Sequence, residues 1–324
     1  MTLLIPVFTI IVSLSLLAYS ADKFVEGASS IAYQFGLSPL LIGLTVVSLG
    51  TSAPEILIGV MSAFSGNSAL AIGNAIGSNI ANIALILGFS SMLMPLPVAS
   101  TVLRREIPLL LCVVLFSTAL LLDLKLTRGD GIAYIGVLLL CLGWLIWQGK
   151  KEPEDVLAAE FDDHVSAPEP MAKLTIITIA ALIVLLVSSR ALVWGAVEIA
   201  RAANVSELMI GLSIVAIGTS LPELAATIAS IMRREFGLAI GGVVGSNLFN
   251  ALAVLGVVAI IGPVEVDAMV RNRDAVVHIG LTVCLLIFCV AWRGNGGRIN
   301  RVEGLALLAA FIGYQWLLFM QEGA

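Results

Sequence analysis

Charged side chains are scarce in this sequence. Asp, Glu, Lys and Arg make up 12% of its 324 residues, against roughly 25% in soluble domains, which argues against an ordinary soluble fold. The two histidines and four cysteines have no metal-ligand spacing, so no cofactor is expected. Aromatic residues are only 6% and no basic arm occurs, which excludes nucleic acid as a partner. No Gly-x-x-x-x-Gly-Lys loop or hydrolytic motif occurs, so we expect neither an enzyme nor an ATP-driven pump.

Apolar residues, in contrast, are abundant: 59% of the chain is hydrophobic and the mean hydropathy is +1.06. A helix that spans a bilayer needs about 20 mostly apolar residues, and ten such runs follow one another. The sequence therefore predicts an all-α integral membrane protein with ten transmembrane helices, surrounded by the lipid bilayer and with no evident protein partner. The predicted spans are residues 3–30, 38–64, 68–96, 106–123, 130–148, 172–200, 206–232, 237–262, 274–292 and 302–320.

The longest connection lies between the fifth and sixth spans and is rich in charge and proline. We expect a first five-helix repeat over residues 1–148, a cytoplasmic linker over 149–171 and a second repeat over 172–324. Because Lys and Arg gather on the cytoplasmic side, we expect a plasma (inner) membrane protein with both termini outside the cytoplasm. Eleven basic residues are assigned to the cytoplasmic side, namely Lys23, Arg104, Arg105, Lys150, Lys151, Lys173, Arg233, Arg234, Arg293, Arg298 and Arg301, and six to the other, namely Lys125, Arg128, Arg190, Arg201, Arg271 and Arg273.

The two halves contain an internal repeat. Residues 39–88 align with 207–256 at a constant offset of 168, and 21 of the 50 positions are identical. Five spans separate equivalent points, and because five is odd, the second half must cross the membrane in the opposite sense to the first. Inverted repeats of this kind occur in secondary transporters, where ion sites lie near the midplane and are built from discontinuous helices. We therefore expect helices 2, 3, 7 and 8 to be broken.

Two polar motifs lie inside apolar runs of the repeat, "GTSAPE" at 50–55 and "GTSLPE" at 218–223. Each proline lacks an N–H and its ring crowds the carbonyl four residues earlier, so the helix should kink or unwind there. Glu55 and Glu223 lie near the centres of their spans, where an ionisable group costs about 3 kcal/mol or more and usually marks an ion pathway. A kink capped by a neighbouring hydroxyl and a protonated structural carboxyl are the alternatives. No basic residue is repeated as a fixed partner, which favours a mobile cation or proton.

Other polar residues are spaced to share a helix face with the acids. Thr51 and Thr219 precede Glu55 and Glu223 by four positions each, which places each pair on one face. The next span of each repeat places small or polar residues at intervals of four, namely Asn74, Ser78 and Asn82, and Gly242, Ser246 and Asn250. Where the inverted halves cross, these faces would form a cage of oxygen atoms. Hard cations such as Ca²⁺ take about 6–8 oxygen ligands, and adjacent hydroxyl pockets would suit Na⁺.

These motifs, with "GNAIGSNIANIALILG" (73–88) and "GGVVGSNLFNALAVLG" (241–256), resemble the two alpha-repeats of the calcium/cation antiporter superfamily. The resemblance is to its sodium/calcium exchanger branch, and the length and layout are similar to the compact prokaryotic members. It implies that Glu55 and Glu223 are shared by Ca²⁺ and Na⁺. It also implies backbone oxygens for Ca²⁺ from Thr51 and Thr219, Na⁺ contacts from Ser52, Ser78, Ser220 and Ser246, and a central pair formed by Asn82 and Asn250.

The resemblance implies a secondary antiporter that exchanges Na⁺ for Ca²⁺ by alternating access, with Ca²⁺ efflux driven by Na⁺ influx. Many family members carry Asp at one position of the central pair, whereas this chain has Asn at both positions, which removes one possible charge. The Gly-Thr-Ser-x-Pro-Glu setting is similar to that of sodium-coupled members rather than of proton/calcium exchangers. A proton-coupled or K⁺-dependent exchanger, a cation channel and a non-transporting membrane scaffold remain as alternatives.

Overall fold

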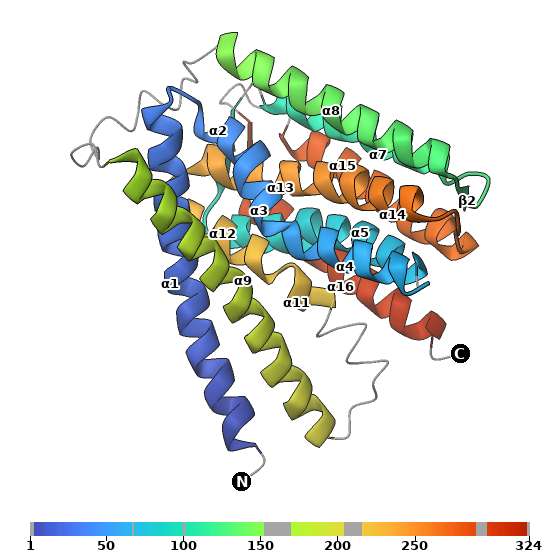
Figure 1. Ribbon diagram of the computed structural model, residues 1–324, viewed down its shortest axis with the longest axis horizontal. Coiled ribbons are helices and arrows are strands. Elements are labelled where there is room, and N and C mark those ends of the chain that lie inside the picture. Colours follow the sequence, from blue (N-terminus) through green and yellow to red (C-terminus); the bar gives the residue numbers. More distant parts are fainter. Residues whose placement is uncertain are drawn as a thin grey trace.

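The computed structural model describes residues 3–66, 68–99, 102–151, 170–203, 216–289 and 297–322 (Figure 1). Most of the predicted linker and the first part of the predicted span 206–232 lie outside these residues. Almost all of the described chain is helical, because in lipid the backbone N–H and C=O groups must be satisfied within the chain. Four short strands were not anticipated from the sequence.

The first half supplies one long helix, a bent segment and a central helix with a π-helical part. Its elements are α1 (Leu4–Gln34), α2 (Pro39–Ile42), the π-helical η1 (Gly43–Val47), α3 (Ser48–Thr51), α4 (Ala53–Phe64), α5 (Ser68–Ile80), π-helical η2 (Ala81–Leu87), α6 (Gly88–Leu93), β1 (Leu96–Val98), π-helical η3 (Val102–Glu106), α7 (Ile107–Leu120), β2 (Lys125–Leu126) and α8 (Arg128–Lys151).

The second half follows the same order. Its described elements are α9 (Met171–Ala202), α11 (Ala216–Thr219), α12 (Leu221–Met232), α13 (Phe236–Phe249), π-helical η6 (Asn250–Val254), α14 (Leu255–Ile261), β3 (Val264–Glu265), π-helical η7 (Val270–Ala275), α15 (Val276–Cys289), β4 (Gly297–Ile299) and α16 (Arg301–Glu322). The bounds of α4 and α12 differ by 168 at both ends, so the offset found in the sequence also relates the secondary structure.

Length and apolarity identify seven helices among the described residues that could each cross a membrane, or eight if the bent pair Pro39–Thr51 and Ala53–Phe64 is one span. The helix α12 has 12 residues, fewer than the roughly 20 that a span requires, and the segment formed by η3 and α7 is not among the seven. The fold is therefore that of an all-α, multi-pass membrane protein.

The predicted breaks in the third and eighth spans take a different form in the structure. Ser68–Leu93 and Phe236–Ile261 are each continuous enough to count as one span. Each contains a π-helical segment instead of a gap, namely η2 in the first half and η6 in the second. The prediction of broken helices here was wrong because a π-helical turn disturbs the i→i−4 ladder without ending the helix.

Two small sheets connect the halves. β1 pairs with β4, with Leu96 opposite Ile299, and β2 pairs with β3, with Lys125 opposite Glu265. Both pairs are antiparallel, and each joins one strand from each half. The halves are therefore interleaved and do not form two separable domains.

The helix α13 is among the most buried elements and packs directly on the bent segment of the first half. A Cβ at Gly241 would lie 2.5 Å from the carbonyl oxygen of Leu40, and one at Gly245 would lie 2.5 Å from that of Leu44. These two positions therefore require glycine, because the backbones approach too closely for a side chain. This close packing brings Ser246, the next residue of α13, to the end of α3.

The two long helices α1 and α9 pack against each other at one edge of the molecule, and α8 lies at another edge (Figure 1). Lys23 lies inside α1 and Arg190 lies inside α9. Both residues lie well inside a helix, and the orientation of the chain stays a prediction.

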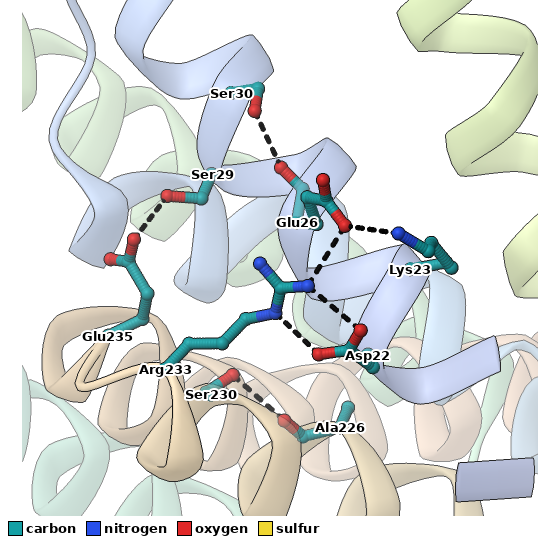
Figure 2. A network of polar contacts seen from close by, with 9 residues as sticks. All are labelled: Asp22, Lys23, Glu26, Ser29, Ser30, Ala226, Ser230, Arg233 and Glu235. Carbon is teal, nitrogen blue, oxygen red and sulfur yellow. Dashed lines mark hydrogen bonds and ion pairs between the residues drawn. The ribbon is translucent and has the colours of Figure 1, made fainter. Parts of the chain in front are cut away.

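A network of ion pairs ties α1 to the end of α12 (Figure 2). Arg233 donates from Nε to Asp22 Oδ1 at 2.6 Å and from Nη2 to Glu26 Oε2 at 2.9 Å. Nearby, Ser29 donates to Glu235 Oε1 at 2.6 Å.

Candidate cation site

Both polar motifs interrupt their helices at the serine. Ser52 has φ −83° and ψ 2° between α3 and α4, and Ser220 has φ −90° and ψ 6° between α11 and α12. The first pair of helices is bent by 44°. Pro54 and Pro222 lie in the first turn of the helix that follows, where a missing N–H is tolerated. The breaks predicted in the second and seventh spans are therefore present.

The two acids follow these breaks and are buried. The exposed fraction is 0% for Glu55 and 3% for Glu223. Ser52 Oγ donates to Glu223 Oε1 at 3.2 Å, which brings the serine of one motif to the acid of the other. Among the described residues, nothing forms a hydrogen bond to either carboxylate oxygen of Glu55 or to Oε2 of Glu223.

The next span of each half lies against this pair of motifs. Thr51 Oγ1 and Ser246 Oγ are 3.5 Å apart, and Thr51 also donates to the Val47 carbonyl at 3.2 Å. Asn82 lies within η2 and Asn250 begins η6. Both are fully buried, and within the described chain their amide oxygens and nitrogens have no hydrogen-bond partner. π-Helical turns are frequent at functional sites because they re-aim side chains and backbone groups.

Buried polar atoms without partners are concentrated at this place. Leaving such an atom unsatisfied costs about 1–3 kcal/mol, and more when it is charged, so native proteins keep few of them. Five of the ten predicted site residues carry such atoms, namely Glu55, Asn82, Ser220, Glu223 and Asn250. A bound cation would satisfy the oxygen atoms of this set.

Two small cavities lie beside the two motifs. One of about 10 Å³ is bordered by Thr51, Glu223 and Gly242, and a volume of this size is about what one water-sized particle requires. The other, of about 120 Å³, lies between α9 and the two motifs. It is lined by Pro54, Ile58, Leu186, Ser189, Arg190, Val193, Gly218, Thr219 and Pro222.

The remaining predicted ligands are less closely connected. Thr219 is half-buried and lies in the wall of the larger cavity. Ser78 is buried on α5, one turn before Asn82, and within the described chain it forms no hydrogen bond to either acid. The Gly218 carbonyl accepts a hydrogen bond from Ser189 Oγ at 3.3 Å. The carbonyl released by Pro222 is therefore capped by a neighbouring hydroxyl, as one of the sequence-based alternatives anticipated.

Several residues near the site were not selected as ligands from the sequence. Asn79 and Asn247 are equivalent in the repeat, and each carries a buried side-chain oxygen without a partner in the described chain. Their identity at the 168 offset was the available signal. Arg190 was assigned to the side of the membrane opposite the cytoplasm, and no sequence pattern placed it beside the cavity.

The sodium/calcium exchanger protein family matches residues 5–147 and 173–320. This chain belongs to that family. The chain is 46% identical to CaxA of Alkalimonas amylolytica over 318 residues, which cover 98% of this chain and 99% of CaxA. It is 38% identical over 327 residues to the inner membrane protein YrbG of Escherichia coli, covering 98% of each.

The structure of this chain is similar to a solved structure of the sodium-calcium exchanger NCX_Mj soaked with zero Na⁺ and Ca²⁺, with a TM-score of 0.82. The two chains are 31% identical, and the match covers 95% of this chain and 97% of that one. This chain therefore shares the fold of NCX_Mj over nearly its whole length.

Proposed function

We propose that the protein is a secondary antiporter that exchanges Na⁺ for Ca²⁺ across the membrane, exporting Ca²⁺ as Na⁺ enters. The observation that carries the proposal is the contact between the two motifs. Ser52, at the helix break before Glu55, donates to Glu223. Both acids are buried, and three of their four carboxylate oxygens have no hydrogen-bond partner in the described chain. Family membership and the likeness to the sodium-calcium exchanger NCX_Mj support the same conclusion.

The exchange would follow from competition for the two carboxylates. A site with two negative charges is neutralised by one Ca²⁺, and its oxygen ligands are of the type that Ca²⁺ prefers. Na⁺ requires the same carboxylates, so occupancy by one ion displaces the other. With neither ion bound, two buried charges would be uncompensated, which is costly in the membrane interior. The empty site would therefore cross between its two open states slowly, and this couples the fluxes.

We assign ten residues to the ion sites. Glu55 and Glu223 serve both ions, and the backbone oxygens of Thr51 and Thr219 serve Ca²⁺. Hydroxyls of Ser52, Ser78, Ser220 and Ser246 serve Na⁺, and Asn82 and Asn250 stand between the acids as neutral amide ligands.

We further propose ten spans arranged as two inverted repeats, with residues 1–148 and 172–324 as the repeats and 149–171 as a cytoplasmic linker. The matched bounds of α4 and α12 and the odd number of intervening spans support the inversion. The bias of basic residues supports termini outside the cytoplasm. The relative YrbG is named an inner membrane protein, which agrees with a plasma-membrane location.

Reconstitution into proteoliposomes tests the function directly. Uptake of radioactive Ca²⁺ should depend on an outward Na⁺ gradient and should saturate with Ca²⁺. A K⁺ gradient or a pH gradient applied alone should not drive it. Uptake driven by the pH gradient, or Na⁺-driven uptake that needs K⁺, would replace the proposal with the corresponding exchanger. Single-channel currents would replace it with a channel.

A further inference from the structure

We propose that Arg190 is a specificity-determining residue that weakens the binding of divalent cations more than that of Na⁺ at the acid pair. This inference rests on the proposed function, because it concerns the competition between the two ions.

The position of Arg190 is unusual for a basic residue. It lies well inside the 32-residue helix α9, which is apolar enough to cross a membrane. An arginine in the interior of a span is costly and is retained where it faces water or an ion pathway. Arg190 is exposed, and it lines the larger cavity.

That cavity lies beside both motifs. Pro54 and Pro222, the residues directly before Glu55 and Glu223, form part of its wall together with Thr219. Arg190 lines the same cavity as Thr219, which we assign to the Ca²⁺ site. An ion that reaches the acids from this cavity therefore passes a fixed positive charge.

Arg190 keeps this charge available to the cavity. A guanidinium does not lose its proton in proteins, and no described residue forms an ion pair with Arg190. Its equivalent in the first repeat, 168 positions earlier, is Asp22, which is bonded to Arg233 (Figure 2). The repeat therefore does not explain Arg190 as a structural copy.

The effect on selectivity follows from the ionic charges. The Coulomb energy between a fixed charge and an ion is proportional to the charge of the ion. Repulsion by Arg190 should therefore be twice as large for Ca²⁺ as for Na⁺. On removal of this charge, the change in the logarithm of the apparent affinity for Ca²⁺ should be twice that for Na⁺.

Arg190→Gln tests this relation. We expect the apparent Na⁺ affinity to rise about threefold and the Ca²⁺ affinity about tenfold, since the second factor is near the square of the first. Both affinities would be measured by direct ion binding to the purified protein in detergent, and by exchange in proteoliposomes. Arg190→Met provides a second neutral variant with a similar stem, and Arg190→Lys should keep the wild-type ratio.

Arg201→Gln is the matched control, because it removes the same charge from the same helix. Arg201 lies eleven residues further along α9 and pairs with Glu198 on the exposed surface. The inference is wrong if both ions change by the same factor, if neither changes, or if the control has the same effect. Failure of the wild-type protein to exchange Na⁺ for Ca²⁺ would instead overturn the proposed function, while the binding measurement would still decide the role of Arg190.

Discussion

The packing of α1 on α12 and the packing of α9 near α4 differ, although the repeat makes these two helix pairs equivalent. α1 lies along α12 and is bonded to its end through Arg233. α9 makes few close backbone contacts with α4, and the larger cavity lies between them. Matched sequences and matched helix bounds thus support two different packings around one pair of acids. A protein with both packings available can open the acids to either side in turn, as alternating access requires.

The side chains at these equivalent positions also differ. Asp22, Glu26 and Arg233 correspond to Arg190, Trp194 and Ser65 at the 168 offset. The ion pairs that join α1 to the end of α12 therefore have no counterpart between α9 and α4. The Asp22 and Arg233 side chains are 45% and 32% exposed, and pairs of this kind contribute about 1 kcal/mol or less. The ion pairs of Arg233 should favour one of the two packings without preventing the change to the other.

Removing an acid should have the largest effect. Glu223→Ala should reduce Na⁺-dependent Ca²⁺ uptake to the background of empty proteoliposomes, because no other group supplies its charge at the helix break. Glu55→Ala should do the same, so the two halves contribute equally in this respect. Membrane insertion and monodispersity in detergent should stay as in the wild type.

Glu265→Ala is the control for these variants, since it removes an exposed acid on β3 of the second half. Exchange at the wild-type rate in either Glu223→Ala or Glu55→Ala would refute the proposed site.

Adding a charge to the central pair should have an intermediate effect. Asn250→Asp introduces a third carboxylate beside Glu55 and Glu223, so the apparent Ca²⁺ affinity should rise about tenfold at neutral pH. The gain should disappear as the pH falls, because protonation removes the added charge. Calcium binding measured at several pH values would check this.

Asn82→Asp should behave in the same way if the two halves are equivalent at the ion site. A gain confined to one of the two variants would show that the site is centred on that half. No change in either variant would place both amides outside the ligand set.

Breaking the ion pairs between α1 and Arg233 should have the smallest effect. Arg233→Gln removes the bonds to Asp22 and Glu26, so α1 should separate from α12 more often. Ser230 borders the small cavity and is 1% exposed. The labelling of Ser230→Cys by a membrane-impermeant thiol reagent should therefore speed up about two- to fivefold, as expected for loss of partly exposed ion pairs.

Arg234→Asn is the matched control, because it removes a neighbouring charge, and asparagine tolerates the left-handed backbone found there (φ 61°). An unchanged labelling rate in Arg233→Gln would show that apolar packing alone holds α1 against α12.

Much of the site could be predicted from particular residues. The prolines located the breaks at Ser52 and Ser220, because a missing N–H acts locally on its own helix. The acids could be selected because a charge in an apolar span needs compensation. The π-helical segments could not be predicted, since the hydrogen-bond pattern of a continuous helix depends on its neighbours as well as on its own residues.

The sequence by itself determined that the chain is an all-α, multi-pass membrane protein, where the second span and its equivalent break, and which residues are equivalent in the two halves. These properties follow from local apolarity, local backbone chemistry and a constant offset. Only the tertiary structure decided that Ser52 bonds to Glu223, that Asp22 is tied while Arg190 lines a cavity, and that the strands join opposite halves. Those contacts join residues far apart in the chain, and the nearly symmetric sequence permits more than one packing to supply them.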